Sequence, residues 1–176
     1  MNSAAISAGP AVAPSSAPRL LGLRILLAIL AGLELFESTI GAPMLLDATS
    51  SFPGPGIGGA NIKLHLAVHP VLALAVLILA VTGYVRQAII TIGVVVLLTW
   101  LGYMPAVARH GLNFSGTGLY QSPAQIFLYP LMGACAIAVA ARSNWLWPAA
   151  ALAGIPSFLG VIGMVTFAIA VAIVGF

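Results

Sequence analysis

Long apolar runs, interrupted by short polar or glycine- and proline-rich stretches, set the pattern of this chain. Runs such as Val71 to Ala80 do not alternate with polar positions, which favours helices over strands. An apolar run of about 18 residues or more is typical of a membrane-spanning helix, so the pattern predicts an all-α integral membrane protein. The bundle of five predicted helices covers about residues 19–40, 62–85, 88–108, 122–141 and 157–176.

The last apolar stretch, residues 148–176, is too long for a simple span. As one helix it would be about 44 Å long, against a hydrocarbon core of about 30 Å. Pro156 is therefore expected to kink it, or to divide a short interfacial piece from the final span. The preceding turns are predicted at Arg86–Gln87 and at residues 142–144, and Pro130 predicts a kink with a freed carbonyl.

Residues 1–18 contain only small, uncharged or weakly apolar side chains and are expected to form a disordered tail. Residues 19–176 then make up a single transmembrane domain. A cleaved signal peptide is the alternative for the first helix, because Arg19 and Arg24 precede its apolar stretch, and it would leave four helices. Glu34 and Glu37 interrupt that stretch, which favours an uncleaved helix.

The composition agrees with a membrane protein. Of the 176 residues, 61% are hydrophobic and only 5% are charged, and the mean hydropathy is +1.15. A soluble domain carries about a quarter charged residues, so the lipid bilayer is the expected partner, in a multi-pass protein of the cell inner or plasma membrane. The basic residues are scattered rather than clustered, which argues against nucleic-acid binding.

The basic residues also predict the orientation, because cytoplasmic helix ends carry the excess of Lys and Arg. With a cytoplasmic N-terminus, four basic residues lie inside and two outside; these are Arg19, Arg24, Arg86 and Arg142 against Lys63 and Arg109. This topology places all three acids and all three histidines in the outer third of the protein, namely Glu34, Glu37, Asp47, His65, His69 and His110.

Intramembrane ionisable residues are costly and tend to be paired or functional. Glu34 and Glu37 share one face of the first helix, and His65 and His69 share one face of the second. Facing these helices toward each other would lower both costs. A Glu–His pair could then share a proton or jointly hold a cation.

Haem b is the leading cofactor hypothesis, with His65, His69 and His110 as candidate ligands. Axial ligands approach the iron from opposite sides, so His65 and His69, on one helix, cannot both bind one iron. His110, expected near the depth of His65, would have to oppose one of them. The protein would then transfer electrons, with a membrane quinone as one partner.

A non-haem metal site is the second hypothesis. Two histidines one turn apart with carboxylates from a neighbouring helix suit zinc, copper or iron, which gives the set His65, His69, Glu34 and Glu37. Polar residues near helix ends are also often chemically idle, in which case no cofactor is bound. The alternative function is then a structural or assembly subunit of a larger membrane complex, joined to a membrane-protein partner or to copies of itself. No nucleophile–base pair, phosphate loop or HExxH motif indicates an enzyme.

Overall fold

The protein is helical throughout the part of the chain that its structure, a computed structural model, describes: residues 17–46, 56–112 and 123–174. The elements are α1 (Ala17–Leu46), α2 (Ile57–Thr82), α3 (Val85–His110), the π-helical turn η1 (Ala124–Leu128), α5 (Tyr129–Arg142) and α6 (Leu146–Val174). No strand occurs in these ranges, so the all-α prediction is confirmed. Four of the helices are long and apolar enough to cross a membrane: α2, α3, the η1–α5 pair and α6 up to Gly163.

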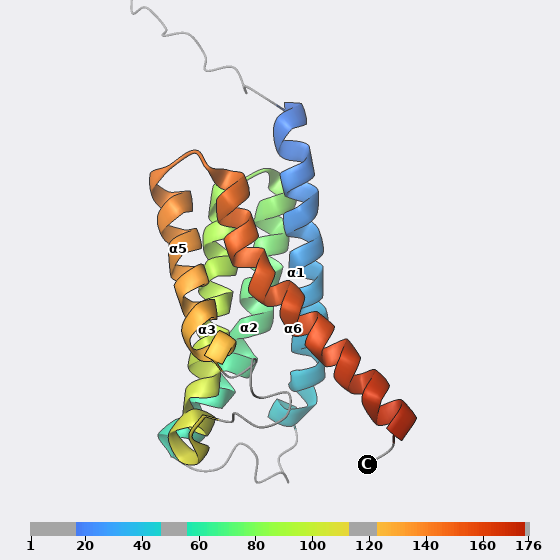
Figure 1. The fold of residues 1–176 in the computed structure, drawn as a ribbon. Helices are drawn as coiled ribbons and strands as arrows, with labels where there is room; N and C mark the ends of the chain where they lie inside the picture. Colours follow the sequence, from blue (N-terminus) through green and yellow to red (C-terminus); the bar gives the residue numbers. More distant parts are fainter. Residues whose placement is uncertain (1–16, 47–55, 113–122, 175–176) are drawn as a thin grey trace, which may run out of the picture.

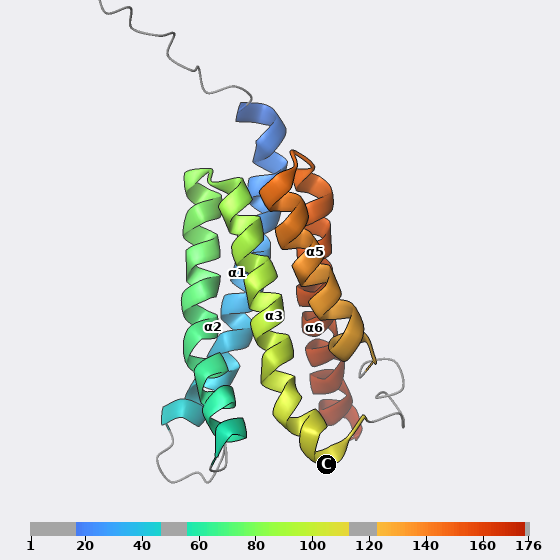
Figure 2. The same cartoon turned by 90° about the vertical axis from the view of Figure 1, so that its left-hand side faces the viewer.

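The helices pack side by side in the order α1, α2, α3 and α5, and α6 runs obliquely against α1, α3 and α5. Figure 2 shows α2, α3 and α5 next to one another, with α1 and α6 behind them. In Figure 1 the second half of α6 leaves the bundle, and the described part of its surface there is largely apolar and exposed, including Val165 and Ile169.

The apolar core fills only one half of the bundle, the half that contains the α2–α3 and α5–α6 turns. It is made of Leu23, Leu27, Leu30, Ala31, Val76, Ala80, Val85, Ala88, Ile89, Ile92, Ala136, Ala140, Ala149, Ala150 and Ala153. Arginines tie the helix ends together at this end. Arg24 donates to the carbonyls of Ala80 and Val81 at the end of α2, and Arg86 donates to the carbonyl of Ser143 after α5.

Several helix boundaries differ from the prediction. Helix α1 ends at Leu46, six residues after its predicted end at about residue 40. The turn expected at Arg86–Gln87 lies at Gly83–Tyr84, because Gly83 takes a φ of +91°, the left-handed conformation in which helices commonly end. Helix α2 begins at Ile57, five residues before its predicted start. Gly58 packs so closely on α3 that a Cβ there would lie 3.2 Å from Pro105 Cβ. Packing against α3 therefore outweighs the low helix propensity of glycine.

The last helix also differs. Helix α6 runs without a break from Leu146 through Pro156, so no separate interfacial piece precedes a span from residue 157. Pro148 is accommodated because it is the third residue of the helix, where a backbone N–H would have no helical partner. The turn expected at residues 142–144 is confirmed at Ser143–Trp145.

At two prolines inside the helical bundle, the backbone carbonyl four residues earlier accepts a hydrogen bond from a side chain of another helix. A proline lacks the N–H that would bond to the carbonyl four residues earlier. Before Pro130 the chain forms the η1 turn, and the Ile126 carbonyl accepts a hydrogen bond from Trp100 Nε1 at 3.0 Å. Before Pro105, the Leu101 carbonyl accepts one from Asn61 Nδ2 at 2.7 Å. The kink predicted at Pro130 corresponds to the η1 turn, and the predicted freed carbonyl is that of Ile126. Residues 1–16 of the predicted tail and Asp47 lie outside the described residues.

Candidate functional site

A buried carboxylate–imidazole pair joins α1 to α2. Glu34 Oε2 and His69 Nε2 lie 2.6 Å apart, and each residue is only 5% exposed. The two helices pack along each other, which brings these side chains together over 35 positions of sequence. One proton lies between the two atoms, carried either by the imidazole or by the carboxyl group. This contact was expected from the cost of leaving each group alone.

The pair lies halfway along its helices. His69 is about 18 Å from the start of α2 at 1.5 Å per residue, and a similar length of helix follows it. The prediction that Glu34 and His69 sit in the outer third is therefore wrong with respect to the bundle. Helix α1 ends six residues later, and α2 begins five residues earlier, than expected. A mid-helix position raises the cost of a lone charge in a membrane, so the pairing matters more there.

His65 lies one turn from His69, and the two rings stack with their centroids 5.1 Å apart. Gly102 of α3 faces the ring of His65, since a Cβ at that position would be 3.2 Å from its Cγ. The Nδ1 atom of His65 is buried and has no hydrogen-bond partner among the described residues. His65 therefore packs between His69 and the backbone of α3.

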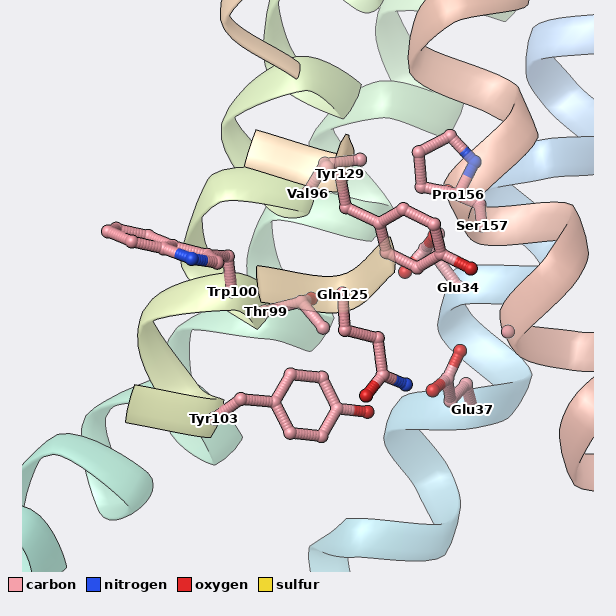
Figure 3. A pocket seen from close by; sticks show the side chains of 11 residues that line it. Glu34, Glu37, Val96, Thr99, Trp100, Tyr103, Gln125, Tyr129, Pro156 and Ser157 are labelled. Carbon is pink, nitrogen blue, oxygen red and sulfur yellow. The ribbon is translucent and has the colours of Figure 1, made fainter. Parts of the chain in front are cut away.

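A small polar cavity lies on the side of Glu34 away from α2. We call it the polar cavity; its volume is about 40 Å³, and about 10–15 Å³ is enough for one water molecule. Figure 3 shows Tyr103, Gln125 and Glu37 pointing toward one another across it. Its polar lining comes from α1, α3, η1, α5 and α6 and consists of Glu34, Glu37, Thr99, Trp100, Tyr103, Gln125, Tyr129 and Ser157.

Ser157 contributes an unsatisfied group to this cavity. The residue is 6% exposed, and its Oγ has no hydrogen-bond partner in the described part of the chain. Hydroxyl groups on helices often donate to the carbonyl of the preceding turn, as Thr166 of the same helix does to Ile162. Because a buried polar group without a partner is costly, the Ser157 hydroxyl is available to water or to a ligand in the cavity.

A second cavity lies between this one and the end of the bundle. This entrance cavity, of about 210 Å³, shares Tyr103 and Gln125 with the polar cavity and extends to His110, Gly111 and Leu112. Tyr103, which lines both cavities, is itself 40% exposed. A row of cavities thus runs from His110 to Glu34.

Within the described ranges, the buried polar residues do not extend in the opposite direction. Beyond the pair lies the apolar core, and all the described residues that are both polar and buried lie outside it; these are Glu34, Ser38, His69 and Ser157. Among the described residues, the polar lining next to the pair therefore extends toward the end of the bundle that carries His110.

The predicted site residues are brought together in part. Glu34, His69 and His65 adjoin one another, and Glu37 lines the polar cavity beside Glu34. His110 is separate, because His65 lies opposite Gly102 and eight further residues of α3, about 12 Å, lead to His110. The expectation that His65 and His110 share a depth is wrong. Helix α2 begins five residues before its predicted start, and α3 ends two residues after its predicted end.

The described residues do not fit a bis-histidine haem b. His69 Nε2 is engaged by Glu34, His65 stacks on His69, and His110 is two turns away. No group of three or more His, Cys, Asp or Glu side chains in the described ranges is arranged to hold a metal ion.

Some of the cavity lining was not foreseen from the sequence. Gln125, Tyr129 and Ser157 are single polar residues within apolar helices, without a spacing that would distinguish them. The available signal was their polarity at positions predicted to lie inside the membrane. Comparisons with protein families, curated proteins and solved structures give no match to this chain.

Proposed function

We propose that this chain is a multi-pass membrane protein that binds and releases protons at the Glu34–His69 pair, in exchange with one face of the membrane. The buried contact between these two side chains, next to a polar cavity, is the observation that carries the proposal. A carboxylate and an imidazole that share one proton are neutral together, and the gain or loss of a proton leaves a net charge of +1 or −1 on the pair. Water and polar side chains in the cavity beside Glu34 would stabilise that charge.

Five membrane helices, with the N-terminus in the cytoplasm of a cell inner or plasma membrane, are the proposed topology. Helix α1 supplies Glu34 and the core residues Leu23 and Leu27, which supports its retention in the mature protein. Arg24, Arg86 and Arg142 lie at one end of the bundle, and Lys63 and Arg109 at the other. The positive-inside rule then makes the first end cytoplasmic, so the entrance cavity opens toward the outer face.

The second candidate function is electron transfer near the outer face, coupled to proton exchange at the Glu34–His69 pair. Quinones take up and release protons together with electrons, and the polar lining that extends from Glu34 toward one end of the bundle favours such a role. Haem b or another redox metal would supply the electron-carrying chemistry. A metal ion would have to be held by Glu34, Glu37, His65 and His69. These donors are not arranged for a metal among the described residues, so the Glu34–His69 contact would first have to open. A visible spectrum and elemental analysis of the purified protein would detect either cofactor.

The proton site is tested by infrared difference spectroscopy of the protein in lipid nanodiscs at acidic and alkaline pH. We expect a reversible carboxyl signal that disappears in Glu34→Gln and changes in His69→Asn. Glu37→Gln is the matched control, since it removes the neighbouring carboxyl and leaves the pair intact. A pH difference spectrum unaffected by Glu34→Gln would refute the proposal. It would leave a structural or assembly subunit, whose partner could cover the exposed half of α6, as the better interpretation.

A further inference from the structure

The polar cavity has the chemistry of a cation site. Its lining includes two carboxyl groups, from Glu34 and Glu37, and no Lys or Arg is among the described lining residues. Glu34 already has His69 as its partner, so the carboxyl group in the cavity without an ion-pair partner among the described residues is that of Glu37. A ligand that complements this lining carries positive charge.

The lining favours an organic ammonium group over a metal ion. Metal ions such as Ca²⁺ and Mg²⁺ need a close shell of six or more oxygens, and no acid or histidine cluster suited to a metal occurs in the described ranges. An ammonium group instead needs acceptors for its N–H bonds, and aromatic faces attract it. The Ser157 hydroxyl and the Glu37 carboxylate supply acceptors, and Tyr103 and Tyr129 supply aromatic rings.

The size of the two cavities limits the ligand. The polar cavity, at about 40 Å³, holds about three groups the size of a water molecule, enough for an ammonium head and the first carbons. The entrance cavity, at about 210 Å³, is lined largely by apolar side chains such as Ala106, Val107 and Ile126. Both are smaller than the roughly 300–1,000 Å³ of sites for drug-sized molecules.

We propose that the polar cavity binds the ammonium group of a small primary alkylamine, between Glu37, Ser157 and the tyrosine rings, with the alkyl part in the entrance cavity. The ligand arrives from the end of the bundle that carries His110. This inference rests on the proposed function, because it places the ligand beside the Glu34–His69 proton site.

Thermal unfolding of the full-length protein in nanodiscs tests the proposal, with n-butylammonium chloride as the probe. We expect a saturable rise in the unfolding temperature. Sodium chloride and tetramethylammonium chloride at the same ionic strength should give none, since one lacks an alkyl part and the other lacks N–H donors. Equal effects of the three salts would show that only ionic strength acts, and would overturn the proposal.

Variants locate the site. Glu37→Gln should weaken butylammonium binding about tenfold or more, which corresponds to about 1.4 kcal/mol, and Ser157→Ala should weaken it about threefold. Thr166→Val is the matched control on α6, because its hydroxyl bonds within its own helix. If Glu37→Gln does not fold, Gln125→Ala takes its place. Unchanged affinity in these variants contradicts the proposal. A persistent Glu34 infrared signal without amine binding would leave the proton site standing and remove only this inference.

Discussion

Trp100 and Asn61 each donate a side-chain hydrogen bond to a backbone carbonyl that lies four residues before a proline. The two prolines would otherwise leave these carbonyls without their usual α-helical donor in an apolar environment, where an unpaired backbone group is costly. The bonds also fix α3 to its neighbours on both sides, since Trp100 reaches η1 and Asn61 reaches α3 from α2. The position of the polar cavity, which α3 and η1 both line, depends on the first bond.

Replacing Trp100 by Phe tests this role. The change keeps an aromatic ring but removes the donor to the Ile126 carbonyl, so we expect the unfolding free energy to fall by about 1–3 kcal/mol. Trp145→Phe is the control, because Trp145 is exposed at the opposite end of the bundle. Unfolding in mixed micelles measures both variants. Equal losses of unfolding free energy in the two variants would show that the Trp100 hydrogen bond does not contribute to stability.

The sequence predicts a Glu–His pair between the first two helices, but neither which glutamate and histidine form it nor the rest of the site. Charged groups inside a membrane are expensive, so the few acids and histidines had to be neutralised, and neighbouring helices were the nearest partners. Ser157 and Gln125 are uncharged, so placing them inside a membrane does not carry the cost of a charged group, and the sequence does not predict partners for them. Whether a neutral side chain faces a cavity or lipid depends on how far its helix is rotated, which no local pattern specifies in helices that are apolar all round.

At the scale of whole helices, α3 and α5 approach each other closely at two glycines, Gly93 and Gly133. A Cβ on Gly93 would lie 2.7 Å from Ile137 Cγ1 and 3.1 Å from the Gly133 carbonyl oxygen. Small residues at helix crossings permit such backbone contact in membrane proteins. The same crossing holds the polar cavity together, because α3 and α5 contribute Tyr103 and Tyr129 to it.

Gly93→Leu should therefore push α3 and α5 apart and lower the unfolding free energy by about 1–3 kcal/mol. Gly32→Leu on α1 is the matched control, since Gly32 is exposed and a Cβ there meets nothing within 4 Å. Denaturant titration of both variants in micelles measures the difference. Equal stability of Gly93→Leu and the parent would mean that the crossing adapts without cost.

Helix number and approximate position follow from the apolar runs, whereas the helix ends do not. The glycine- and proline-rich stretch before Asn61 indicates a loop by composition, yet Gly58 and Gly59 are helical because they let α2 approach α3. That contact involves residues more than forty positions apart. The consequence for the site is large, since the added turn of α2 moves His69 from a helix mouth to the middle of the bundle.

Across the whole molecule, the polar and apolar halves of the bundle are separated along its axis. The apolar half carries the arginine-capped turns, and the other half carries the two cavities and the Glu34–His69 pair. Under the proposed function the Glu34–His69 pair exchanges protons with one face, and passage to the other face would require the core around Leu27 and Ile89 to open. The orientation decides which face that is.

Cysteine labelling determines the orientation. In a Cys135→Ala background, Arg109→Cys should react with a membrane-impermeant maleimide in intact cells, because the positive-inside rule places that end of α3 outside. Asn144→Cys, in the exposed turn between α5 and α6, should react only after the membrane is permeabilised. The reverse pattern would place the entrance cavity on the cytoplasmic face, and the proton on Glu34 would then exchange with the cytoplasm. Labelling at both positions in intact cells would contradict a fixed orientation, and with it the one-sided exchange on which the proposed function depends.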